Sequence, residues 1–283
     1  MNPVKIITDS TADLSRELLE EFDIVSLPLL VRFGEESYRD GIDITTDKLY
    51  ELVEEKGELP KTSAISPGIF YQEFKKWIDL GYDIVYTGIG SKISGTFHSA
   101  NVAREGFPDN RIFLVDSLNL SSGIALLLLK AKDLRDQGKS AKVIYDELMD
   151  TVPRVRSQFA IKVLDYLHKG GRASGLSALV GKFLRVRPII QVREGKLDVY
   201  KKPMGKMLKA VDLMLEDYFV ENDNIDLEYV MITHTMAYKQ AAYMENKVRE
   251  QLMPKELIIS EAGCVISSHC GAGTIGILYI VKK

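Results

Sequence analysis

The sequence has few cysteines, no surplus of basic residues and no long apolar run. Its two cysteines, Cys264 and Cys270, are too few for a disulfide scaffold in 283 residues, and reduced thiols fit the cytoplasm. Lys and Arg number 37 against 40 Asp and Glu, a formal net charge of −3, so nucleic acid is not an expected partner. The longest apolar run in the middle of the chain, residues 124–129, is far below the roughly 20 residues of a membrane span.

The N-terminal segment also lacks the features of a targeting sequence. It reaches Asp9 before the apolar core of a signal peptide could form. We therefore expect a cytoplasmic protein without a membrane span.

What is present is the composition of an ordinary globular protein. Hydrophobic residues make up 46% and charged residues 27% of the chain, which excludes disordered and collagen-like classes. The length corresponds to roughly two domains of about 150 residues each. Such a chain can bury a substantial core without metal or disulfides.

In the N-terminal half, short apolar strands alternate with helices. A strand over residues 4–10 precedes a helix over residues 14–22, for which Asp13 is the predicted N-cap. Strands over residues 83–88 and 111–117 are each followed by a helix, over residues 94–105 and 120–137 respectively. This order predicts a three-layer α/β/α domain with a mostly parallel sheet, over residues 1–158.

Between the first two strands lie a helix over residues 46–56 and an extended link over residues 60–66. The next helix opens with Ser66 as N-cap and Pro67 at its first position. After residue 158 hairpin and helix mix, which predicts an α+β domain with a mixed sheet over residues 159–283. Its expected elements are strands over residues 159–163, 228–233, 256–260 and 274–281, a hairpin over 187–201 that turns at Glu194-Gly195-Lys196, and helices over 206–220 and 237–252.

The common motifs of nucleotide-binding proteins, serine hydrolases and zinc proteases are incomplete or absent. Gly271, Gly273 and Gly276 have G-x-G-x-x-G spacing, but too few residues follow for the required acidic partner. Gly90 and Gly95 have Walker A spacing without the Lys-Ser/Thr that must follow. G-x-S-x-G and H-E-x-x-H do not occur.

A metal site is also not expected. Cys264, His269 and Cys270 lie in one short stretch without a second cluster, whereas a structural zinc needs about four ligands. Buried thiols are the favoured explanation of the two cysteines.

Hydroxyl-rich turns at predicted strand ends are the remaining candidate site. In open α/β sheets, ligands gather at the carboxyl ends of strands, where helix N-termini favour anions. Ser94, followed by Gly95, is predicted to cap a helix and to offer a hydroxyl and an N–H to a ligand oxygen. Thr62 is not needed as a cap, and His269 lies in the turn at residues 267–271, where it could donate to a carboxylate. A plain cap, a solvated threonine and a structural histidine are the alternatives.

Six short motifs, in order along essentially the whole chain, resemble those of the DegV family. One departure is Ala272, where many members carry proline. The motifs are Thr8-Asp9-Ser10-Thr11-Ala12-Asp13-Leu14, Thr62-Ser63 before Ser66-Pro67, Ser94-Gly95-Thr96 with Ser99-Ala100, Val115-Asp116-Ser117, Tyr166-Leu167-His168-Lys169-Gly170-Gly171-Arg172, and His269-Cys270-Gly271-Ala272-Gly273.

The resemblance implies a two-lobed α/β protein that buries one long-chain fatty acid and needs no other cofactor. Some members are the acyl-binding subunit of bacterial fatty acid kinase, in which a separate ATP-using partner phosphorylates the bound carboxylate. It implies that Thr62 and Ser94 bind the carboxylate, with His269 as a third contact. Arg172 and Gly95 are expected near the head group or on a partner-facing surface, and no residue is expected to be catalytic.

This role is physically coherent. A tail of about fifteen methylenes at ~0.8 kcal/mol each supplies roughly 12 kcal/mol before ordering costs. The buried carboxylate needs hydrogen-bond donors to offset its desolvation. One alternative is a hydrolase or phosphotransferase with Ser94 or Thr62 as nucleophile, His269 as base and Asp9 or Asp116 orienting it. Another is a sensor of small anions that binds no lipid.

Overall fold

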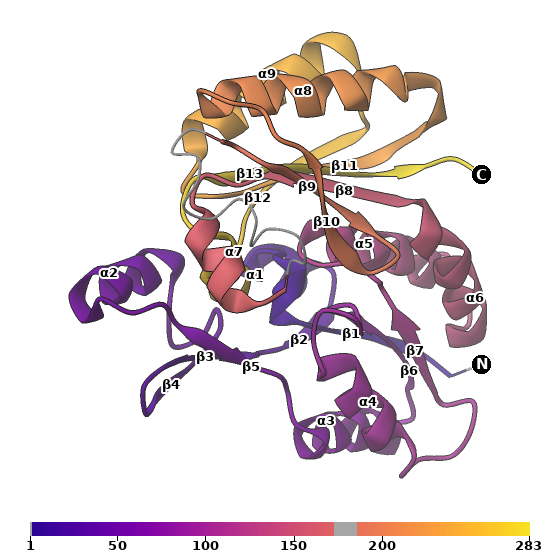
Figure 1. Cartoon of the computed structure of the whole chain (residues 1–283). Helices are drawn as coiled ribbons and strands as arrows, with labels where there is room; N and C mark the ends of the chain where they lie inside the picture. Colours follow the sequence, from indigo (N-terminus) through magenta and orange to yellow (C-terminus); the bar gives the residue numbers. More distant parts are fainter. Residues whose placement is uncertain (1, 173–185) are drawn as a thin grey trace.

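The computed structural model of the chain describes residues 2–172 and 186–283, which form two lobes (Figure 1). The N-terminal lobe is built on four strands, namely β1 (Val4–Asp9), β2 (Ile24–Leu27), β6 (Asp83–Gly88) and β7 (Ile112–Asp116). Their order is β2-β1-β6-β7, and all neighbours are parallel. The strands are short apolar runs because both faces of the sheet are buried.

Helices cover both faces of this sheet, which confirms the predicted three layers. The helices α3 (Pro67–Asp79) and α4 (Thr96–Arg104) pack on one face. The other face carries α5 (Ser122–Asp136) and α6 (Ala141–Thr151). A short helix, α1 (Arg16–Glu21), follows β1.

A small antiparallel sheet adjoins this lobe (Figure 1). Its strands are β3 (Leu30–Phe33), β4 (Glu36–Arg39) and β5 (Lys61–Ser63), in the order β4-β3-β5, and α2 (Thr46–Lys56) lies between β4 and β5 in the chain. The segment predicted as an extended link therefore contains a strand, β5, which carries Thr62.

The C-terminal lobe is built on a mixed six-stranded sheet, as predicted. The helices α8 (Met207–Val220) and α9 (Tyr238–Gln251) cover its outer face (Figure 1). Two short helices, α7 (Leu164–Gly170) and α10 (Cys264–Cys270), pack against each other. The strands are β8 (Val155–Ala160), β9 (Ile189–Arg193), β10 (Lys196–Lys201), β11 (Ile225–Thr235), β12 (Glu256–Glu261) and β13 (Thr274–Val281), in the order β10-β9-β8-β13-β11-β12.

The helix α5 lies between the two sheets and joins the lobes. Residues 124–129, the apolar run of the sequence, are all fully buried. The helix contacts β1 and β6 of one sheet and β8, β11 and β13 of the other. A helix that is apolar on every side is stable only where it is covered on every side, and the two sheets provide that cover. None of the helices in residues 2–172 and 186–283 combines the length and apolarity needed to cross a bilayer.

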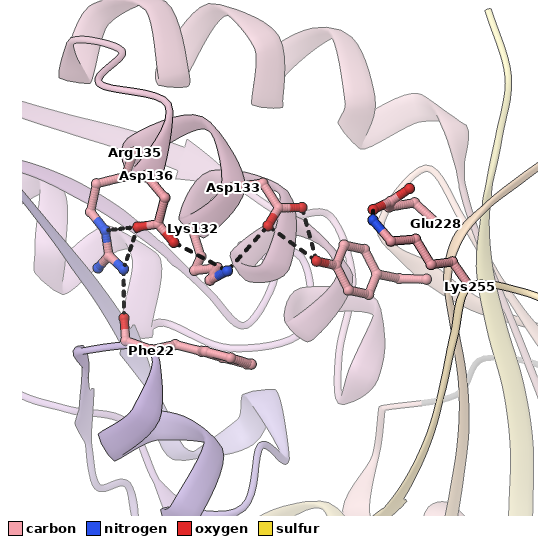
Figure 2. Close-up of polar contacts among 8 residues, drawn as sticks. Phe22, Lys132, Asp133, Arg135, Asp136, Glu228 and Lys255 are labelled. Atoms are coloured by element: carbon pink, nitrogen blue, oxygen red, sulfur yellow. Dashed lines mark hydrogen bonds and ion pairs between the residues drawn. The ribbon is translucent and has the colours of Figure 1, made fainter.

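Polar contacts at the C-terminal end of α5 tie it to both lobes (Figure 2). Arg135 donates to the backbone oxygen of Phe22 over 2.8 Å, and Lys132 pairs with Asp136. On the other side, the Tyr229 hydroxyl of β11 donates to the Asp133 carboxylate over 2.9 Å. These contacts link the C-terminal end of α1, helix α5 and the C-terminal sheet.

Replacing Tyr229 by phenylalanine is expected to lower the free energy of unfolding by about 1 kcal/mol, because the half-buried Asp133 carboxylate loses a donor. Urea unfolding measures the change. Tyr71→Phe is the matched control, since Tyr71 is exposed. Equal stabilities of the two variants would contradict a contribution from the Tyr229 hydroxyl.

Three local predictions are wrong, and each has a physical reason. α1 begins at Arg16 with Ser15 as N-cap, whereas Asp13 has a left-handed backbone (φ 55°) and its carboxylate contacts a distant segment. Ser94 is not an N-cap, because α4 begins at Thr96 and Gly95 occupies the cap position. The predicted turn over residues 267–271 belongs largely to α10, which ends at Cys270.

The division at residues 158 and 159 stays a prediction. The first strand of the C-terminal sheet, β8, begins at Val155. The C-terminal α10 packs against α2, β3 and β5 of the N-terminal half, so the two halves are in contact there.

Candidate functional site

A cavity of about 110 Å³ lies where β5, the loop before α4 and helices α7 and α10 meet. All five residues singled out from the sequence line it, namely Thr62, Ser94, Gly95, Arg172 and His269. They come from four separate segments of the chain. The structure thus brings the five together, while their roles stay predictions.

The Thr62 hydroxyl and the His269 ring are in direct contact. Thr62 Oγ1 and His269 Nε2 lie 2.9 Å apart. His269 Nδ1 is buried and has no hydrogen-bond partner among the described residues. If Nε2 carries the proton and donates to Thr62, the Thr62 hydroxyl hydrogen is free to donate into the cavity.

His269 is neutral over the physiological pH range. Burial, and secondarily the nearby positive charge of Arg172, lower the pKa of His269 to about 4. A neutral ring can hydrogen-bond an anion without first having to bind a proton. The ring therefore works here as a fixed donor or acceptor, rather than as a cation.

Acidification from pH 7.5 to 4.5 is expected to cost the folded state about 2 to 3 kcal/mol at His269. The pKa is about 4 in the fold against an ordinary 6.5, so the unfolded chain takes up a proton first as pH falls. The stability that the neutral His269 ring gives to the folded state is fully present above pH 6.5 and is lost as pH falls through 4. Urea unfolding measures the stability of the unaltered chain and of His269→Gln at both pH values. The difference between the two should be about 2 to 3 kcal/mol smaller at pH 4.5 than at pH 7.5.

An NMR titration of the His269 ring provides the direct check. The His269 signal is identified as the one that the His269→Gln variant lacks. It should remain that of the neutral ring down to about pH 5. A midpoint near 6.5 would contradict the buried, neutral ring.

Ser94 lies in the loop between β6 and α4. Its Oγ accepts a hydrogen bond from Thr96 N over 3.3 Å and lies 3.0 Å from Thr96 Oγ1. The hydroxyl therefore sits at the N-terminal end of α4, although it is not the cap residue. The positive end of the helix dipole and the Ser94 hydroxyl can act on one anion.

A buried carboxylate holds the loop that carries Ser94. Asp9 at the end of β1 accepts hydrogen bonds from Ile89 N over 2.9 Å and from the Tyr86 hydroxyl over 3.0 Å. A Cβ at Gly88 would lie 2.0 Å from Asp9 Oδ2, so glycine is needed for this close approach. Burial raises the pKa of Asp9, and the hydrogen bonds oppose that rise.

Two further carboxylates hold the N-terminus of α10, whose last turn carries His269. Asp13 accepts from Gly263 N over 2.9 Å, and Asp40 accepts from Cys264 N over 2.7 Å. Burial raises the pKa of both carboxyl groups. The motifs of the sequence contain Asp13, but its partner lies 250 residues away and could not be inferred.

The segment Gly170-Gly171-Arg172 closes the cavity beside His269. Arg172 Nη1 donates to the Gly170 carbonyl over 2.6 Å. A Cβ at Gly170 would lie 2.4 Å from His269 Nδ1, so any side chain there would displace the ring. The sequence motif contains Gly170, but its close packing against the His269 ring could not be predicted from the sequence.

Behind the polar residues the walls are largely apolar. A second cavity of about 30 Å³ shares Leu120, Ile266 and Cys270 with the first. Phe159 and Leu278 also line this second cavity, and polar residues such as Ser121 and Thr274 complete its wall. Burial raises the pKa of the Cys270 thiol to about 12, so this side chain behaves as a small apolar group. The two cavities therefore adjoin each other, with the side chains of Leu120, Ile266 and Cys270 in the wall between them.

The geometry supplies only part of a hydrolytic triad. Thr62 and His269 are in hydrogen-bond reach. The acids expected to orient His269 bond elsewhere, because Asp9 accepts from Ile89 N and Asp116 accepts from Ser91 N. Among the described residues, no group of three or more His, Cys, Asp or Glu side chains is arranged to hold a metal ion.

Comparisons with known proteins agree with one another. The family model described as "Uncharacterised protein, DegV family" matches residues 3–282. A DegV domain-containing protein of Clostridium acetobutylicum is 34% identical over 282 residues, with 100% of both chains covered.

Solved structures match over the whole chain. A DegV family protein from Thermus thermophilus, described by its fatty acid binding, shares 27% identity with a TM-score of 0.92 and 100% of both chains covered. DegV from Bacillus subtilis, a fatty acid binding protein, shares 28% with a TM-score of 0.85 and 100% of both chains covered. A stearic acid-binding protein from Eubacterium ventriosum shares 28% with a TM-score of 0.84, covering 99% of this chain and 98% of that chain.

Proposed function

The chain belongs to the DegV family, and from that premise we propose that it binds one long-chain fatty acid between its lobes. The family resemblance of the sequence motifs is confirmed by the full-length matches. Relatives with 27% and 28% identity are described as binding fatty acid. The observation that carries the proposal is a pair of adjoining cavities, the first with hydroxyl and imidazole groups and the second with a largely apolar surface.

The carboxylate is assigned to the polar end. The hydroxyls of Thr62 and Ser94 donate to its oxygens, and His269 orients Thr62 through the 2.9 Å contact or donates directly. Uncharged donors offset the desolvation of the carboxylate without placing a second charge in the apolar surroundings. Arg172, at the rim, contributes a positive charge, and Gly95 lets a ligand approach the start of α4.

The hydrocarbon tail is assigned to the apolar path past Leu120, Ile266 and Cys270. The cavities of about 110 and 30 Å³ are smaller than the roughly 300 Å³ at which small-molecule sites begin. A long acyl chain must therefore displace wall side chains, and Leu120 and Ile266, which lie between the two cavities, are the side chains that should change rotamer. That reordering reduces the ~12 kcal/mol that burial of the tail could supply.

The finer part of the proposal is that the chain presents this carboxylate to another enzyme. The carboxylate end faces the rim at Ser94 and Arg172, whereas the tail is enclosed. The sequence carries no intact nucleotide-binding motif of the kinds tested above, so a phosphoryl donor would be held by a separate ATP-using kinase subunit. The chain would then be a carrier and not itself the catalyst.

Mass spectrometry of an organic extract tests the binding. Protein purified from cells should release about one fatty acid per chain, and delipidated protein should take up added palmitate or oleate. An empty protein that also refuses both acids would overturn the proposal. Release of a short polar anion would favour the small-anion sensor, and turnover of an acyl ester that is lost on Ser94→Ala would favour the enzyme.

A further inference from the structure

We infer that the free edge of β12 is a docking surface for an extended, basic segment of a partner protein. The surface, here termed the β12 groove, has a volume of about 400 Å³ and lies between β12, the start of α1 and the loop that leads into α2. The groove shares Ala262 with the second cavity, but none of the residues assigned to the carboxylate lines it, and the inference does not rest on the proposed function. Four observations support the assignment.

The first observation is that β12 presents unpaired backbone groups. It is an outer strand of the six-stranded sheet and, within residues 2–172 and 186–283, pairs only with β11. Ala262 N donates to His234 O of β11, and in a parallel ladder successive residues point their groups to opposite sides. The N–H and C=O of Ile259 and Glu261 therefore point away from β11, where an added strand could bond them.

The second observation is the apolar surface along the groove. Ile42 is 59% exposed and Ile259 is 38% exposed, and both line the groove. Tyr238, 55% exposed, stands beside it because its hydroxyl donates to Glu261 over 2.8 Å. Large apolar and aromatic side chains that remain exposed next to a free strand edge are typical of a protein interface.

The third observation is the charge. The lining residues include four carboxylates, Asp13, Asp40, Asp47 and Glu261, and no Lys or Arg. Asp47 and Glu261 are exposed, whereas Asp13 and Asp40 are buried at the floor. An approaching segment with Lys or Arg at alternate positions would meet the exposed pair, and an acidic segment would be repelled.

The fourth observation concerns the shape. The groove follows consecutive residues of β12, from Ile258 to Glu261. An extended segment of about four to six residues fits such a strip, because each residue of a strand advances roughly 3.3 Å. A helix would bury less of the strand edge and would leave its outward N–H and C=O groups without partners.

A labelled peptide with the sequence Lys-Val-Lys-Ile-Lys-Val, acetylated and amidated, tests the inference by fluorescence anisotropy. It should bind the full chain at least about tenfold more tightly than the Glu-Val-Glu-Ile-Glu-Val counterpart, and added salt should weaken it. Amide NMR shifts on titration should concentrate at Ile259, Glu261 and Ile42. Absence of binding, or equal binding of both peptides, would overturn the inference.

Two variants separate backbone pairing from charge. Ile259→Pro removes one outward N–H without removing a bond to β11, since proline is tolerated at such edge positions. It should weaken the peptide about tenfold or more, whereas Ile259→Val should not. A double Asp47→Lys, Glu261→Lys variant should lose the preference for the basic peptide.

Folding of each variant is checked by circular dichroism and the thermal midpoint. If Ile259→Pro does not fold, the charge-reversed variant still tests whether the basic peptide binds at the β12 groove. Basic-peptide binding that survives the charge reversal would overturn the inference. A dimer seen by sedimentation and abolished by Ile259→Pro would assign the groove to a second copy of this chain, which would also overturn it.

Discussion

A variant in which valine replaces Thr62 and alanine replaces Ser94 is expected to bind palmitate about 10²- to 10⁴-fold more weakly than the unaltered chain. Each hydrogen bond to a buried carboxylate contributes about 1.5 to 3 kcal/mol, and the two substitutions remove both hydroxyl donors. The apolar path behind them is unchanged, so the tail would still favour the cavity. Without these donors, however, the carboxylate would lose its hydration and gain few hydrogen bonds to replace it.

Isothermal titration of delipidated protein with palmitate measures this loss. Ser37→Ala is the matched control, because Ser37 is exposed on β4 and does not line the cavity. The thermal midpoint of the double variant shows whether it folds. Undiminished binding by a folded double variant would contradict the placement of the carboxylate at Thr62 and Ser94.

Much of the fold could be predicted because its signals are local. Ser66 and Pro67 mark the start of α3, and the helix begins there. Glu194 and Gly195 mark the turn between β9 and β10, where both have positive φ. The strand over residues 274–281 is found with the same bounds, as β13. In each case the signal that predicts the element lies in neighbouring residues of the sequence.

The candidate site could be predicted only in part, because its construction is non-local. The hydroxyl-rich turns and the family motifs singled out Thr62 and His269, but 207 residues separate them and nothing in the sequence indicates a direct contact. The helix that carries His269 was predicted to be a turn, since its seven residues are rich in serine and cysteine. Its N-terminus is held by Asp13 and Asp40, which are far away in the chain.

The helix α5 illustrates a pattern that the sequence displays but does not explain. The run over residues 124–129 is too short for a membrane, and periodicity alone does not say what buries it. The explanation lies in the arrangement of the two lobes, because both sheets pack on the same helix. The candidate cavity lies near the N-terminal end of this helix, where Leu120 forms part of the wall.

Replacing Cys270 by phenylalanine is expected to give the largest effect on the tail, and the effect should depend on chain length. Cys270 lines both cavities, so a benzyl group there would block the proposed passage of the tail from one cavity to the other. If about four methylenes of palmitate can no longer be buried, the loss of ~0.8 kcal/mol each weakens binding by roughly 200-fold. A shorter acid places fewer methylenes beyond Cys270, so the penalty should fall along the series from palmitate to octanoate.

The chain-length dependence separates a blocked passage from a damaged fold. Cys270→Ala, which keeps the passage open, should bind every acid in the series within about threefold of the unaltered chain. A misfolded Cys270→Phe variant would weaken all acids by the same factor, because the head-group donors would be lost as well. If a folded variant bound palmitate as tightly as before, the tail would follow another route, and Leu120, Ile266 and Cys270 would be ordinary core residues.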